Sequence, residues 1–309
     1  MAVYEHTYKQ YLGNLTPEWS RFLVIPRHAF RDVFKSKLFT AFYVICFVPL
    51  LVEAILIYLH HNVGAIEILK SMQIVNNIKE LIPIDASFFE FFVNCQGVFV
   101  FLVTLLVGPP LVARDLRNNA LPLYLCRPFS RTDYVLGKMS VLLILLSAIT
   151  WAPQLLLFLF QSYLEGPGWF VSNLSLASAI FIGSVVWILL LALLSQAVSA
   201  LVKWRVIASG ALLGIFFIPS VFGEVVNQLF QTRWGSIISL GASIKHVTSG
   251  LFGTFLRAST HITDWDGRVG HEIVVYEPPL WASWFVLFLV CAICLALLSR
   301  KVKAYEVVR

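Results

Sequence analysis

Residues 173–201 have the sequence NLSLASAIFIGSVVWILLLALLSQAVSAL, and no charged side chain interrupts them. The hydrocarbon core of a bilayer is about 30 Å thick, and a helix needs about 20 residues to cross it. This stretch is long enough and apolar enough to predict a membrane-spanning helix.

Other stretches of the same kind lie before and after it. Together they give six predicted spans, at Leu38–His60, Phe88–Ala113, Met139–Gln161, Asn173–Leu201, Val206–Phe230 and Pro279–Ser299. The 309-residue sequence is 59% hydrophobic and 13% charged, which is too apolar for a water-soluble fold. Ten-residue segments of alternating polarity, the mark of a membrane barrel, are absent. The sequence therefore predicts an all-α, polytopic integral membrane protein with a single transmembrane domain over residues 1–309.

Lys and Arg residues are distributed unevenly over the segments between the spans. Most of the 23 lie in residues 1–37, 114–138, 203–205 and 300–309. Positive charges close to a span are retained on the cytoplasmic side, so we expect both termini to be cytoplasmic in the cell (inner or plasma) membrane. The net charge of +6 is explained by this bias and by attraction to anionic membrane lipid. Nucleic acid is therefore not an expected partner.

The cytoplasmic N-terminal segment, residues 1–37, is expected to contain a helix that lies in the membrane interface. Thr16 and Pro17 are typical of a helix start, and apolar and basic side chains alternate with helical spacing after them. Pro26 predicts a kink in this helix. The alternative is a basic flank that only orients the first span. Because the segment lacks an apolar core followed by a cleavage site, no removable signal peptide is expected.

Two external connections are long. Residues 62–87 carry apolar residues with helical spacing among charged ones, which predicts a short amphipathic helix. Residues 231–278 begin with an apolar part rich in Gly and Ser, from Ile237 to Phe255. We expect this part either to be re-entrant or to lie on the external surface before the last span.

The segment between the second and third spans has the most distinctive sequence in the chain. Residues 114–131 are RDLRNNALPLYLCRPFSR, and Gly137 and Lys138 follow. The segment resembles the permease subunits of ABC-2 type transporters, in which an acidic residue precedes a short leucine-rich helix, an R-P-x-S-R turn and a G-K pair. Asp115 stands where the family often has Glu, and residues 119–120 stand where it often has Gly-Thr.

The resemblance implies the membrane half of an ATP-driven transporter. In this family two permease copies or paralogues work with two ABC ATPase (nucleotide-binding) subunits, transport follows alternating access, and most members export lipids, glycans or hydrophobic drugs. A cytoplasmic coupling helix within residues 114–133 would contact the ATPase. The residues that the resemblance assigns to this contact are Arg114, Asp115, Arg117, Leu121, Leu123, Leu125, Arg127, Pro128, Ser130 and Arg131.

The composition of this loop agrees with a docking role. Leu121, Leu123 and Leu125 beside several arginines give an apolar centre with a charged rim, which suits contact with a protein partner. The alternative is that these leucines pack on the chain's own helix ends.

The sequence contains no phosphate-binding loop, because Gly137-Lys138 lacks the upstream glycine of such a motif. The chain is therefore not expected to be an enzyme by itself, and ATP and Mg²⁺ would be bound by the partner ATPase. Cys291 and Cys294 lie within a predicted span without a second pair, so we interpret them as packing residues rather than metal ligands. No cofactor or metal is expected in this chain.

The glutamates inside the predicted spans are the candidate substrate-path residues Glu53, Glu90 and Glu224. Each lies toward the external end of its span, where a charge costs less than at mid-bilayer. They either line the path, are structurally paired, or tip toward water. Three glutamines lie deeper and are candidates for hydrogen bonds between helices: Gln96, Gln154 and Gln196. A secondary transporter that uses the glutamates as proton sites, a membrane-embedded enzyme and a scaffold are the alternative functions.

Overall fold

The computed structural model describes residues 24–62, 83–118, 131–202, 204–230, 232–254 and 278–301. These residues form helices and no strand, which confirms the predicted all-α class for the described part of the chain. Six helical segments are long and apolar enough to cross a membrane, at Lys37–His61, Ala86–Asp115, Thr132–Glu165, Leu174–Leu201, Arg205–Phe230 and Leu280–Arg300. Each coincides with a predicted span, although the third begins at Thr132 instead of Met139.

The fourth span, α11 (Leu174–Leu201), forms the centre of the bundle. It packs against α6 (Ala86–Arg117), α8 (Arg131–Ile149) and α14 (Leu280–Lys301). Within the most apolar stretch of α11, 61% of the residues are buried. In the corresponding stretch of α12 (Arg205–Phe230) only 17% are buried. Small buried residues on α11, Ala192, Ala197 and Ser199 among them, allow helix backbones to approach closely.

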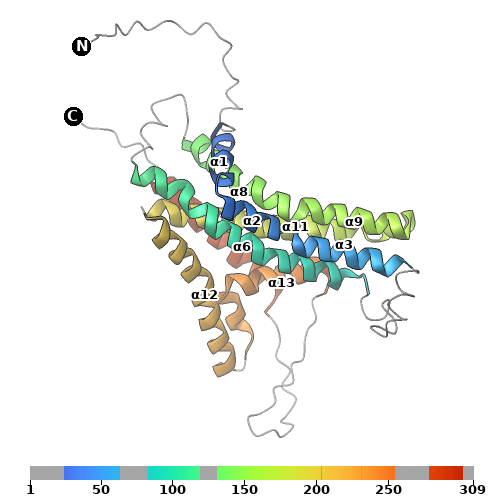
Figure 1. The fold of residues 1–309 in the computed structure, drawn as a ribbon. Coiled ribbons are helices and arrows are strands. Elements are labelled where there is room, and N and C mark those ends of the chain that lie inside the picture. Colours follow the sequence, from blue (N-terminus) through green and yellow to red (C-terminus); the bar gives the residue numbers. More distant parts are fainter. Residues whose placement is uncertain are drawn as a thin grey trace, which may run out of the picture.

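The fifth span, α12, diverges from the direction of the other spans (Figure 1). Most of its large apolar side chains are exposed, among them Ile218, Val221 and Phe222. Such a surface is unfavourable in water but matches acyl chains. The exposure therefore supports a membrane environment around this helix.

Several helix ends gather at one end of the bundle (Figure 1). This end, here named the α1 end, holds α1 (Val24–Phe34), the ends of α6 and α14, and the starts of α8 and α12. This grouping agrees with the alternation of loops on which the orientation prediction depends. That the α1 end is cytoplasmic stays a prediction.

The first span consists of two helices, α2 (Lys37–Ile45) and α3 (Val48–His61), separated by a turn. Pro49 stands in the first turn of α3 and has no backbone N–H to continue a helix across the turn. Gln96 Nε2 on α6 donates a hydrogen bond of 3.0 Å to the carbonyl oxygen of Cys46 at the break. Gln96 thus makes the predicted hydrogen bond between helices.

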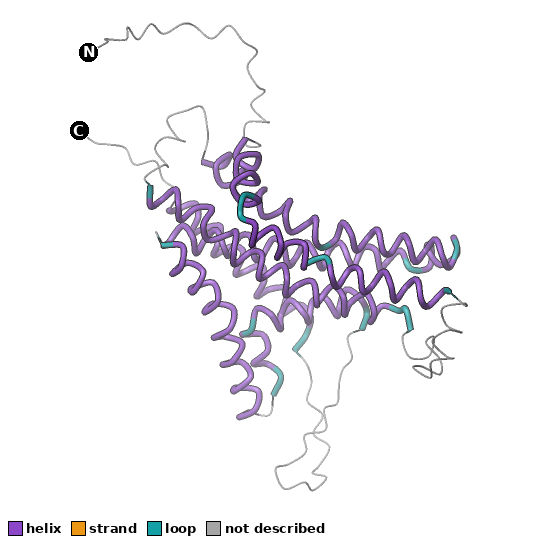
Figure 2. Tube along the Cα trace, in the orientation of Figure 1, coloured by secondary structure: helices purple, strands orange, loops and turns teal. Residues whose placement is uncertain are grey.

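The third span is also interrupted, between α8 and α9 (Trp151–Glu165). Thr150 has a non-helical backbone at this point, and its Oγ1 donates to the carbonyl oxygen of Leu146 at 2.7 Å. Pro153 follows in the first turn of α9, where a proline is tolerated. A tight turn follows α9 at Gly166, with φ of 102°, and leads into α10 (Pro167–Ser172). Figure 2 shows how short these connections are.

Pro109 and Pro110 lie inside α6, where they remove backbone donors. Ser199 on α11 supplies a bridge at this point, because its Oγ accepts from Ala113 N at 2.8 Å and donates to Pro109 O at 2.6 Å. An undistorted helix would join these two backbone groups directly. The inserted hydroxyl therefore satisfies both groups and ties α6 to α11.

The segment after α12 folds back on the bundle. It comprises η2 (Trp234–Ile238) and α13 (Leu240–Phe252), which begins at the N-cap Ser239 and packs against α11 and α14. Gly223 on α12 and Gly235 lie in such close contact that a Cβ on either would overlap the other's carbonyl oxygen. The re-entrant character of α13 stays a prediction, and residues 255–277 lie outside the described residues.

Two further predicted helices are described only in part. In the N-terminal segment, α1 buries Ile25 and packs Ala29, Phe30 and Val33 against the core. Residues 1–23 lie outside the described residues, so the kink at Pro26 is not tested, and the interfacial position of α1 stays a prediction. Residues 63–82, where we expect the amphipathic helix, are also outside the described part.

Candidate functional site

An ion pair joins the ends of α6 and α8 on either side of residues 119–130. Lys138 Nζ lies 2.9 Å from Asp115 Oδ2, and the Tyr134 hydroxyl donates to the same oxygen at 2.8 Å. Lys138 Nζ also lies 5.7 Å from the centre of the Tyr134 ring. Tyr134 and Lys138 are four residues apart, which places them on one face of α8.

Burial makes this cluster stronger than a surface pair. Tyr134 is 1% exposed and Lys138 is 7% exposed, so water competes little for the carboxylate. The cluster holds the last turn of α6 against the first turns of α8. Both ends of the 119–130 segment are thereby fixed to the bundle.

The sequence-predicted coupling residues fall into two groups. Arg114, Asp115 and Arg117 belong to the described end of α6, and the guanidinium of Arg117 lies 5.5 Å from the centre of the Trp204 ring. The side chain of Arg131 lies outside the described part of the chain. The remaining coupling residues lie outside it altogether: Leu121, Leu123, Leu125, Arg127, Pro128 and Ser130. Their contact with an ATPase stays a prediction.

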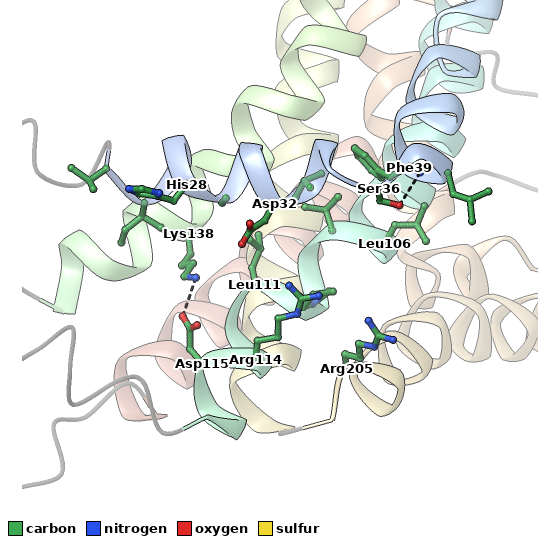
Figure 3. A pocket seen from close by; sticks show the side chains of 17 residues that line it. His28, Asp32, Ser36, Phe39, Leu106, Leu111, Arg114, Asp115, Lys138 and Arg205 are labelled. Atoms are coloured by element: carbon green, nitrogen blue, oxygen red, sulfur yellow. Dashed lines mark hydrogen bonds and ion pairs between the residues drawn. The ribbon is translucent and has the colours of Figure 1, made fainter.

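A cavity of about 560 Å³ lies beneath α1 at the same end of the bundle (Figure 3). Its walls come from α1, α2, α6, α8 and the start of α12. Arg114 and Arg205 extend toward this space from α6 and α12, while Asp32 reaches it from α1 (Figure 3). The Asp115–Lys138 pair forms a third side. The cavity is therefore bordered by charge and continues along apolar helix surface.

Glu53 is fully buried on α3. Both of its carboxylate oxygens lack a hydrogen-bond partner within the described residues. The side chain of Gln154 on α9 faces it, yet neither polar atom of that amide makes a hydrogen bond of normal geometry in the described part. For Glu53 the interpretation that it tips toward water is therefore wrong, because packing of α3 against α9 and α6 encloses it.

The other two glutamates lie in different surroundings. Glu90 on α6 accepts hydrogen bonds from the hydroxyls of Ser249 and Thr254, at the end of α13. These contacts indicate a structural pairing. Glu224 is exposed on α12. The three glutamates thus have different surroundings, and their role in transport stays a prediction.

The predicted polar glutamines also differ from one another. Gln96 makes its bond between helices, whereas the amide atoms of Gln154 and Gln196 are buried without hydrogen-bond partners among the described residues. For Gln196 the described residues supply no such bond, whereas Gln154 on α9 faces Glu53 on α3, so for Gln154 the bond between helices stays a prediction.

Lys138 was identified from sequence as part of the G-K pair, but Tyr134, Arg205 and Asp32 were not identified as residues of this site. Tyr134 could have been found from its helical spacing to Lys138 and from the acidic Asp115 near the end of the preceding span. Arg205 and Asp32 carry no such signal, because they approach the cavity from separate helices. Within the described residues, no group of three or more His, Cys, Asp or Glu side chains could hold a metal ion.

No protein-family model matches the chain, and no curated protein matches it either. The ABC-2 resemblance therefore rests on the residues of the loop between the second and third spans.

Proposed function

We propose that this chain is the permease subunit of an ABC exporter, working as a dimer of such subunits with two separate ATPase subunits. The observation that carries the proposal is the ion pair between Asp115 and Lys138. The resemblance selects both residues from opposite sides of residues 119–130, and they contact each other. A partner that pulls on this loop would therefore move α6 and α8 together.

A secondary transporter driven by an ion gradient is the second candidate. Glu53 favours it, because a buried carboxylate without a described partner is a feature of proton sites in membrane proteins. Against it, Glu90 is held by hydroxyls and Glu224 is exposed, so neither resembles Glu53 in its surroundings.

The test is co-purification from native membranes with a tag on the full-length chain. We expect a soluble ATPase to be retained and ATP hydrolysis to require it, since the chain has no phosphate-binding loop. The double variant Leu121→Asp and Leu125→Asp should lose the ATPase while keeping a normal yield, because it places charge at an apolar contact. Stoichiometric ATP binding by the pure chain would contradict the proposal.

The matched control is the double variant Val171→Asp and Leu174→Asp, at two exposed apolar positions at the other end of the bundle. It should keep the ATPase bound. If the Leu121 and Leu125 variant still retains and stimulates its ATPase, the loop is not the coupling element. A reduced yield of that variant alone would instead show that the leucines pack on this chain's own helices.

A further inference from the structure

The cavity beneath α1 has an excess of positive charge. The charged or titratable side chains that line it are His28, Asp32, Arg114, Asp115, Lys138 and Arg205. Asp115 and Lys138 neutralise each other at 2.9 Å. Among the described lining residues, Arg114 and Arg205 then face a single carboxylate, that of Asp32, and neither arginine forms an ion pair in this part of the chain.

The same cavity has an apolar wall that extends away from the arginines. Leu106 precedes Arg114 by two turns of α6, which is about 12 Å along the helix axis. Leu38 and Leu106 both line the cavity and are 86% and 50% exposed. Because these side chains lie within spanning segments, the wall is open to the acyl chains of a surrounding membrane.

We propose that this cavity binds an anionic phospholipid, with Arg114 and Arg205 holding its phosphate and Leu38 and Leu106 contacting an acyl chain. A guanidinium matches the geometry of phosphate oxygens and forms charge-assisted hydrogen bonds with them. Basic pockets between spans are suited to anionic headgroups for this reason. The two arginines come from α6 and α12, so the bound lipid joins the divergent fifth span to the rest of the bundle.

The basic side and the apolar wall of the cavity together indicate which molecule it binds. A soluble phosphate would use the arginines but would leave the exposed leucines without a partner. A zwitterionic lipid would bind more weakly, since its headgroup has no net negative charge to compensate the positive excess of the site. The inference is independent of the transport proposal and gives Arg114 a role other than contact with an ATPase.

The test is native mass spectrometry of the delipidated full-length chain with phosphatidylglycerol. The double variant Arg114→Gln and Arg205→Gln should bind it about tenfold more weakly, as expected for loss of charge-assisted bonds. Its matched control is Arg27→Gln and Arg31→Gln, which removes two exposed arginines of α1 that do not line the cavity. The control should bind as the wild type does.

A second variant, Asp32→Asn, removes the carboxylate that repels a phosphate and should tighten phosphatidylglycerol binding. This gain keeps the inference testable if the arginine variant fails to fold. An equal loss of binding in the Arg27 and Arg31 control would show general attraction to the basic face and overturn the inference. Equal affinity for phosphatidylcholine, or for glycerol 3-phosphate without acyl chains, would overturn it as well.

Discussion

Replacement of Lys138 by Met tests whether the ion pair at the α1 end stabilises the bundle. The substitution keeps the length of the side chain and removes its charge. Asp115 then keeps the Tyr134 hydroxyl as its described partner, but its carboxylate has lost the ammonium group 2.9 Å away. We expect the free energy of unfolding to fall by about 2–4 kcal/mol, because a mostly buried charge is left uncompensated.

The size of the effect follows from distance and burial. Two unit charges 2.9 Å apart attract each other by about 1.4 kcal/mol in water and by about 6 kcal/mol at an effective dielectric constant of 20. The two side chains are 9% and 14% exposed, so the pair lies between these limits. After part of the attraction is offset by desolvation, we expect a coupling energy of about 2–3 kcal/mol.

The assay is equilibrium unfolding in mixed micelles with increasing SDS, followed by tryptophan fluorescence. A double-mutant cycle combines Lys138→Met with Asp115→Asn and isolates the pairwise energy. The double variant should be more stable than the sum of the two single losses predicts, since neither charge is then left alone.

The control is Lys37→Met, which removes an exposed lysine at the start of α2. Such a surface change is expected to alter the free energy of unfolding by no more than about 0.5 kcal/mol. The reasoning is refuted if Lys138→Met is no more destabilising than this control, or if the coupling energy is below about 0.5 kcal/mol.

Three further predictions concern packing and orientation. Ser199→Ala removes the hydroxyl that bridges Ala113 and Pro109, and should lower the free energy of unfolding by about 1–3 kcal/mol in the same assay. Gly223→Ala forces a Cβ against the carbonyl oxygen of Gly235, which moves η2 away from α12. The substitution should lower the free energy of unfolding by about 1–3 kcal/mol. In intact cells, a single cysteine at Asp266 should react with an impermeant thiol reagent, whereas one at Asn118 should not, as the distribution of Lys and Arg predicts.

Each of these three predictions has its own control or contradicting outcome. Ser178→Ala removes an exposed serine from the same helix as Ser199 and should leave stability unchanged. Gly210→Ala adds a methyl group on α12 where nothing lies within 4 Å and should be neutral or slightly stabilising. External labelling at Asn118 would reverse the predicted orientation of the chain.

The number of helices apolar enough to cross a membrane and their approximate positions could be determined from the sequence, because crossing a bilayer depends on local length and hydrophobicity. The tight turn at Gly166 and the short connection before Arg205 were predictable for the same reason, since both lie between apolar stretches. The start of the third span was predicted too late, at Met139 instead of Thr132. Gln96 was correctly identified as a residue that bonds between helices, because a buried amide in an apolar span needs a partner.

Only the tertiary structure decided which side of each span is buried and what its polar groups meet. In lipid, the exposed face of a helix is as apolar as the buried one, so α11 and α12 look alike in sequence while one is central and the other diverges. The Ser199 bridge and the enclosure of Glu53 depend on the rotation of each helix about its own axis and on which helix lies beside it. Hydrophobic periodicity fixes that rotation in water but carries little information about it where both faces of a helix are apolar.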